Sequence, residues 1–389
     1  MSDTPSGFGF PFGMDPESLR DAPLFREMQR VMSSSSGPIN WELARQVGVA
    51  SAVDAGEDVE PTGEDRQGFE EAVRVAELHV ARFTGLAPPS DVAPVRVIRR
   101  AEWVNLNTES LRSLLEPAAE RVSTEMLRIQ QEGPDGHGGM LAQISPLLMG
   151  AQVGSVLGFL AQHVLGQFDV AVPRSGPGAV MFVVANIRTF ETDWSLDRTD
   201  FRTWVALHEV THRFEFAQPW ARDRFVGLLD DFLSTLRIDV DGMQSRLATL
   251  DGADPEAIQG LFEGEQGLFG AELDDEQRLK LGRIQAFMAA AEGYGDHVMH
   301  ALGAELLPSY GRIDEAMRRY REGEEGDPVF ERLLGVDMKR AQYADGRSFC
   351  DTVVSLTDEA TLSGMWDSAD AMPSLPEISE PRLWLARTV

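Results

Sequence analysis

The pentapeptide His208-Glu209-Val210-Thr211-His212 restricts what this 389-residue chain can fold into more than any other feature. Two histidines four residues apart lie one turn above each other on a helix, so their imidazole nitrogens can bind one Zn²⁺ together. Glu209 lies about 100° around the same helix, where its carboxylate can act on a water molecule at the metal without being a ligand. The pattern therefore requires a helix at this position.

The residues around the pentapeptide favour that helix. Thr199 or Asp200 is suited to cap its start, and Pro219 marks its end. A His-Glu-x-x-His match arises by chance in roughly one chain in a hundred of this length, so the flanking pattern is needed to prefer a metal site over two histidines on a solvated face. Apolar residues with the spacing of a buried helix are Phe201, Trp204, Val205, Leu207, Val210 and Phe214.

A catalytic zinc site needs one more ligand, because such sites usually take three protein ligands and a water. Residues 291–297 read Ala-Glu-Gly-Tyr-Gly-Asp-His and place Glu292 in an otherwise apolar helix. A carboxylate is rarely buried in such a helix unless it is paired or binds a metal. Asp296 lies on the same helical face and could accept the second ring N–H of His208 or His212. The rival third ligands, the last two less favoured, are His297, Asp296, His300, Glu215 and Asp230.

The combination of His208-Glu209-x-x-His212 with Glu292-x-x-x-Asp296 resembles the gluzincin metallopeptidases, the group that includes thermolysin. In that group the glutamate of the second helix is the third ligand, and the aspartate four residues later is its supporting partner. The resemblance therefore implies zinc ligation by Glu292 and a supporting role for Asp296. Glu292 follows His212 by 80 residues, a longer spacing than in thermolysin, so extra helices must loop out between them.

Segments 206–214, 292–298 and 339–343 are similar, more closely, to a mostly actinobacterial family of zincin-like metallopeptidases or hydrolases. Some of its members are associated with biosynthesis of a deazaflavin cofactor. The similarity covers most of residues 38–389. It implies an α-rich, zincin-like fold and does not supply a substrate.

We expect a mainly α (α+β) protein, with a zincin-like metallopeptidase core, a small sheet and an additional helical bundle. Residues 1–37 are interpreted as a flexible N-terminal arm, 38–175 as a helical N-terminal part, and 176–389 as the metal-binding part, packed as one unit with 38–175. The acidic, glycine-rich segment 239–275 is interpreted as an insertion. Helical periodicity is clear after Asn40, from Phe69 to Phe83, from Leu111 to Ile129, from Phe225 to Leu236 and from Leu279 to Leu302.

Two apolar stretches bear on the architecture. Residues 140–165 are interrupted by polar residues too often for a bilayer, and Gly150, Gly154 and Gly158 recur every four residues, which predicts a close approach of another helix. Residues 178–187 are the best strand candidate. They precede the metal helix, so they could form an edge strand along the cleft or an ordinary core strand.

Composition restricts the partners and the compartment. The formal net charge of −28 disfavours nucleic acid and anionic membranes as partners. The lone Cys350 permits no intrachain disulfide and is expected to be a small core residue. No secretion signal is recognisable at the N-terminus, so a cytoplasmic location is expected.

These patterns predict a zinc-dependent hydrolase, most directly a metallopeptidase that acts on a peptide or a small amide. The metal would lower the pKa of its water and polarise the carbonyl, and Glu209 would pass a proton to the leaving amine. A zinc-binding protein with a scaffolding role, or a hydrolase of a small amide or ester in cofactor metabolism, is the alternative. Candidate donors to a developing oxyanion are Tyr294, His297, His300 and Tyr343.

Overall fold

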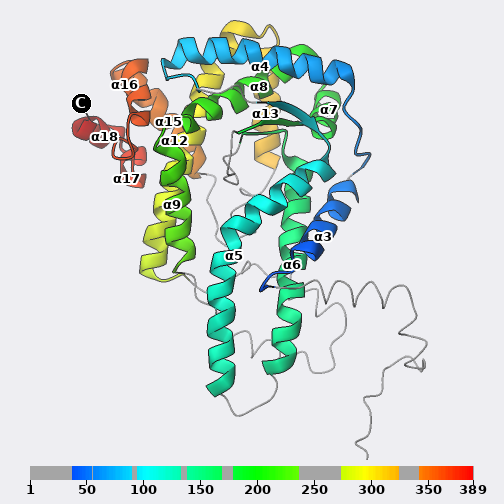
Figure 1. The fold of residues 1–389 in the computed structure, drawn as a ribbon. Coiled ribbons are helices and arrows are strands. Elements are labelled where there is room, and N and C mark those ends of the chain that lie inside the picture. Colours follow the sequence, from blue (N-terminus) through cyan, green and yellow to red (C-terminus); the bar gives the residue numbers. More distant parts are fainter. Residues whose placement is uncertain are drawn as a thin grey trace, which may run out of the picture.

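The computed structural model describes residues 37–54, 56–89, 94–132, 138–168, 178–235, 273–323 and 341–388. The expected N-terminal arm lies outside these residues except for Gly37, and the expected insertion 239–275 except for its last three residues. As predicted, the fold is mainly α with one small sheet (Figure 1).

Helices account for most of the described chain. Those before the metal motif are α3 (Trp41–Asp54), α4 (Gly63–Thr84), α5 (Arg100–Glu132), α6 (Gly138–His163) and α7 (Val184–Asp193). The motif lies on α8 (Arg198–Phe216), which α9 (Ala221–Leu233), α12 (Asp275–Leu306) and α13 (Tyr310–Gly323) follow. The C-terminal elements are α15 (Ala341–Leu356), α16 (Glu359–Ser363), a 3₁₀ turn (Gly364–Trp366), α17 (Leu375–Ser379) and α18 (Pro381–Thr388).

The three strands are β1 (Val95–Ile98), β2 (Gly166–Phe168) and β3 (Val180–Val183), in the order β1-β3-β2. β3 runs parallel to β1 and antiparallel to β2. The expected strand 178–187 was too long, because α7 begins at Val184, and a continuous apolar run does not separate strand from helix. Of the two alternatives, an edge strand along the cleft or an ordinary core strand, the structure shows the second. β3 is the central strand, and all four of its residues are buried.

The sheet separates two hydrophobic cores. Val180 and Phe182 of β3 pack into a core formed with α4, α8, α12 and α15, whereas Met181 and Val183 pack into a core formed with α3, α5 and α6. This alternation follows from the two-residue period of a strand. In Figure 1, α4 and α8 cover one side of the sheet, and α5 and α6 extend away from the other.

Residues on both sides of the expected boundary at 175 contribute to the same sheet and core. β1 and β2 precede that boundary and β3 follows it, while α4 packs against α8 in one core. The division of the chain at this point stays a prediction. Buried Cys350 belongs to the same core, as expected.

Glycines bring α6 into close contact with α3, as the four-residue spacing predicted. A Cβ added at Gly154 would lie 2.5 Å from the carbonyl oxygen of Ala44, and Gly150 and Gly158 face Asn40 and Ser51 in the same way. Within the described ranges, none of the helices combines the length and apolarity that a bilayer crossing needs. The apolar character of α6 is explained by this packing.

A buried carboxylate ties α4 to the metal-motif helix. Asp65 of α4 is fully buried and contacts Arg188 of α7 at 2.5 Å and both Arg198 and Arg202 of α8 at 3.0 Å. Burial by itself would raise the pKa of Asp65, but hydrogen bonds from Thr62 and the charges of the arginines outweigh it and hold that pKa far below its ordinary value. This network fixes where α8 starts.

We predict that Gly154→Ala lowers the free energy of unfolding by about 1–3 kcal/mol, because the added methyl group would overlap α3. Gly227→Ala is the matched control, since nothing lies within 4 Å of a Cβ at this exposed position of α9. It should raise the free energy of unfolding by about 0.5–1 kcal/mol. Urea unfolding measures both, and equal effects of the two variants would contradict the close helix contact.

We predict that Asp65→Asn lowers the free energy of unfolding at pH 7 by about 3 kcal/mol or more, because three arginines lose their buried anion. The folded-state pKa of Asp65 is lowered, so its contribution is present above the unfolded-state pKa of about 4 and is lost as the pH falls below it. The difference from wild type should therefore narrow towards pH 2.5. The exposed Asp193→Asn serves as the control, and a difference that does not change with pH would refute the assignment.

Candidate metal centre

The helix that carries the metal motif is fixed at its start by Asp197. The carboxylate of Asp197 accepts hydrogen bonds from the backbone N–H groups of Thr199 and Asp200, both at 3.0 Å, so Asp197 is the N-cap. The expected cap at Thr199 or Asp200 was therefore two or three residues too late. Asp200 instead accepts hydrogen bonds from Ser309, before α13. As expected, α8 ends before Pro219, at Phe216.

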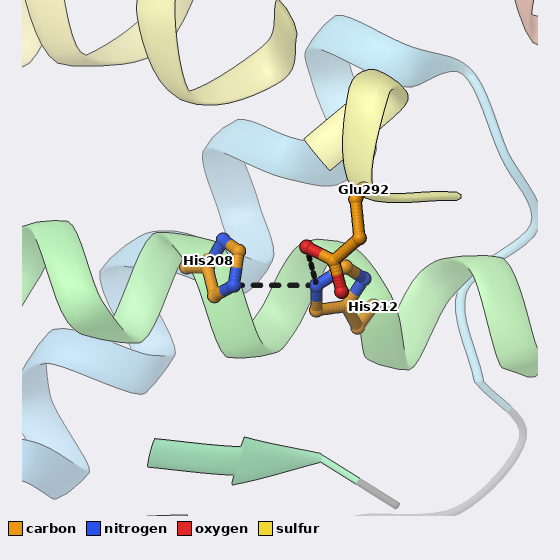
Figure 2. Close-up of side chains that lie close together, drawn as sticks. All are labelled: His208, His212 and Glu292. Carbon is orange, nitrogen blue, oxygen red and sulfur yellow. Dashed lines mark hydrogen bonds and ion pairs between the residues drawn. The ribbon is translucent and has the colours of Figure 1, made fainter. Parts of the chain in front are cut away.

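The two histidines of the motif face each other through their Nε2 atoms, which lie 3.3 Å apart (Figure 2). Two nitrogens that each bind zinc at 2.0–2.1 Å with a tetrahedral angle lie roughly 3.3–3.4 Å apart. The observed separation is therefore that of two imidazoles arranged around one metal ion.

Glu292 of α12, the third ligand that the sequence analysis favoured, places a carboxylate oxygen beside this pair. Its Oε2 lies 3.7 Å from Nε2 of His212, and one ligand atom of each of His208, His212 and Glu292 lies within 4.8 Å of the others. Figure 2 shows Glu292 reaching down from α12 towards the two rings. Segments 80 residues apart in the chain thus meet at one point.

Glycines on both sides of Glu292 allow α12 to lie this close. A Cβ at Gly295 would lie 3.3 Å from Cε1 of His212, so a larger side chain would press on the ring. On the opposite face, a Cβ at Gly293 would lie 2.7 Å from the backbone nitrogen of Arg347 in α15. The two glycines let α12 fit between the metal helix and α15, which sets the height of Glu292 above the imidazoles.

His212 is oriented by Glu215, one turn further along α8. Its Nδ1 lies 2.7 Å from Oε2 of Glu215, whose side chain is 0% exposed. A hydrogen bond from Nδ1–H to this carboxylate leaves the lone pair on Nε2, the atom that faces His208 and Glu292. We expected Asp296 to take this role. At His212 the partner is Glu215 instead, while Asp296 lies half-buried one turn beyond Glu292, and its role towards His208 stays a prediction.

Glu209 lies between the metal ligands and the sheet. It is 5% exposed, and a Cβ at Gly166 of β2 would lie 2.6 Å from its Oε1. Gly166 therefore leaves space for this carboxylate, which packs directly on the β2 backbone. No residue of the motif itself indicated this contact, because it depends on the position of a three-residue strand.

The charges around the ligands favour a cation at this point. Burial by itself would lower the pKa of His212, but the negative charges of Glu215, Glu292 and Glu209 outweigh it and raise that pKa to about 10. Burial also raises the pKa of Glu215. Three carboxylates around two imidazoles in a largely buried site favour a compensating positive charge, and a divalent ion bound at the Nε2 atoms would supply it. The donor set of two imidazoles and one carboxylate fits Zn²⁺.

Three of the rival third ligands, Glu215, Asp230 and His297, have other surroundings. Glu215 is on the Nδ1 side of His212, and Asp230 is exposed on α9. His297 lies between Asp351, at 2.7 Å from its Nδ1, and Glu359, at 3.1 Å from its Nε2. These contacts leave Glu292 as the carboxylate that completes the group.

The candidate oxyanion donors are engaged in other contacts. Tyr294 is 1% exposed and its hydroxyl lies 2.9 Å from the hydroxyl of Ser363, while both ring nitrogens of His297 face carboxylates. His300 is exposed, and its Nδ1 lies 3.0 Å from the hydroxyl of Tyr310. These contacts do not support the donor roles of Tyr294 and His297, which stay predictions. The side chain of Tyr343 lies outside the described part.

Comparisons with known proteins agree with this geometry. One solved structure, from Chloroflexus aurantiacus and provisionally described as a hydrolase with a novel fold, is 32% identical in sequence, with a TM-score of 0.65. The match covers 90% of this chain and 98% of that one. A search of curated proteins gives no significant match. The zincin-like metallopeptidase family matches residues 39–385, nearly the whole chain, and the protein belongs to this family.

Proposed function

We propose that the protein is a zinc-dependent hydrolase that cleaves amide or peptide bonds, with His208, His212 and Glu292 as the zinc ligands and Glu209 as the general base. The observation that carries the proposal is the convergence of three ligand atoms within 4.8 Å, with Glu209 buried on the same helix beside them. Membership of the zincin-like metallopeptidase family supports it.

Zinc, when bound, supplies a Lewis acid that activates water and polarises a carbonyl group. The carboxylate of Glu209 accepts the proton that the attacking water loses and donates it to the nitrogen of the leaving amine. The packing of Glu209 on Gly166 holds its carboxylate in one place. The reaction therefore does not have to meet the entropic cost of positioning this group. Glu215 keeps the Nδ1 proton on His212 throughout.

An extended peptide is the substrate that the sheet supports best. The backbone N–H of Val183 donates to the carbonyl of Leu165, so these two residues form a hydrogen-bonded pair of the β2–β3 ladder. Because such pairs alternate along an antiparallel ladder, the N–H and C=O of Gly166 point away from β3. β2 is an edge strand in the described part of the sheet, and this edge lies beside Glu209. A substrate backbone can pair there.

The charge of the protein is consistent with such a substrate. A formal net charge of −28 would repel a polyanion such as nucleic acid. A peptide or a small amide carries no such charge density, and we propose these as the substrate class.

We predict that purified wild-type protein binds one zinc per chain, and that His212→Ala and Glu292→Ala each lose most of it, because two remaining ligands hold zinc weakly. His300→Ala is the control, since this rival ligand is exposed and contacts Tyr310 instead. Elemental analysis after dialysis against a weak chelator measures all four proteins. Loss of zinc from His300→Ala with retention in Glu292→Ala would disprove the ligand assignment.

We predict that Glu209→Gln keeps zinc but lowers kcat/KM by about 10²–10⁴-fold on any peptide that the wild type cleaves, because the amide cannot accept the proton. A library of fluorogenic peptides, with a panel of small amides and esters, identifies the substrate, and zinc content is measured on the same samples. Undiminished turnover by the variant would rule out Glu209 as the base. Zinc-loaded wild type that cleaves none of these compounds would contradict the hydrolase function itself.

A further inference from the structure

Among the described residues of the centre, Glu215 is a carboxylate with no access to solvent. It lies at the end of α8, three residues after His212, and its side chain is 0% exposed. Its Oε2 contacts Nδ1 of His212 at 2.7 Å. Its Oε1 is buried and has no hydrogen-bond partner among the residues that the structure describes.

The surroundings of Glu215 do not otherwise account for a buried carboxylate. The negative charge of Glu215 contributes to raising the pKa of both Tyr294 and Cys350, so the two side chains lie near it. The hydroxyl of Tyr294, however, contacts the hydroxyl of Ser363. An unpaired carboxylate oxygen in an apolar core carries a large desolvation cost. Within the described part of the chain, the hydrogen bond to His212 is the side-chain contact of Glu215 that offsets this cost.

That contact acts on the ligand atom opposite. A carboxylate on Nδ1 holds the proton there, keeps the Nε2 lone pair directed at the ion, and makes the imidazole a more basic ligand. Glu292 and His208 approach Nε2 from the other side of the ring. Glu215 therefore influences the metal without touching it.

We propose that Glu215 is a positioning residue for the metal centre, which sets zinc affinity by fixing the proton and the ring orientation of His212. This inference rests on the zinc site of the proposed function and adds a determinant that neither the family match nor the motif assigns. It makes Glu215 the cause of tight binding at a centre whose three ligands alone would hold zinc more weakly.

The alternative is that Glu215 merely stabilises the fold as a buried partner of α8. The two roles differ in what an amide in its place would do. Glutamine keeps the length and an acceptor oxygen for Nδ1–H but removes the charge. For a structural role, the amide preserves zinc affinity or destabilises the apo-protein. For a positioning role, zinc affinity falls while the apo-protein stays folded.

The experiment measures the zinc dissociation constant by chelator competition, and the thermal unfolding midpoint of the apo-protein, for wild type, Glu215→Gln and Glu215→Asp. We expect zinc binding about 10–100-fold weaker in Glu215→Gln, with an apo midpoint close to that of wild type. Glu215→Asp keeps the charge on a shorter side chain and should recover part of the affinity. It also tests the proposal if the glutamine variant does not fold.

A second comparison shows whether the effect passes through His212. In a His212→Ala background, Glu215→Gln should leave the residual zinc affinity unchanged, because the imidazole that transmits the effect is gone. Equal zinc affinity of wild type and folded Glu215→Gln would overturn the inference and leave the proposed function intact. Wild-type protein that binds no zinc would overturn both.

Discussion

The molecule depends on one long-range contact, the approach of Glu292 on α12 to the paired imidazoles of α8. The three ligand atoms lie within 4.8 Å of one another, although 80 residues separate His212 from Glu292 in the chain. The contact is possible because α12 presents Gly295 to the ring of His212 and Gly293 to the backbone of α15. In the absence of a cation, three carboxylates would repel one another here, so the packing of α12 holds together a group of charges that a bound metal ion would neutralise.

The rest of the fold serves to hold α8 in place beneath α12. Asp65 fixes the start of α8 to α4 through Arg198 and Arg202, and Asp197 caps it. Val180 and Phe182 of β3 pack into the core that contains α8, and β2 carries Gly166 against Glu209. Helices α3, α5 and α6 build a second core on the other face of the sheet. The site thus combines α8, which carries both histidines and Glu209, with Glu292 of α12, and Glu209 is held by the β2 backbone as well as by its own helix.

The three candidate ligands can be selected from the sequence because their signals are local. The spacing of His208 and His212 requires a helix, and Glu292 is unusual as a carboxylate in an apolar one. The carboxylate that contacts Nδ1 of His212 was harder to predict, because Asp296 and Glu215 both lie one helical turn from a candidate ligand. Only the orientation of the His212 ring decides between them. A carboxylate three residues after the second histidine, on the face of a buried helix, was the available signal for Glu215. β2 was not predicted because three residues carry no periodicity, and β3 was drawn too long because the apolar run continues into α7.

Anomalous diffraction from a crystal of the zinc-loaded protein, recorded at the zinc absorption edge, tests the central claim most directly. The account predicts one strong peak about 2.0–2.2 Å from Nε2 of His208, Nε2 of His212 and a carboxylate oxygen of Glu292, with Glu215 still on Nδ1 of His212. A peak bound by the two histidines but with Glu292 outside bonding distance, or a peak elsewhere in the molecule, would contradict it.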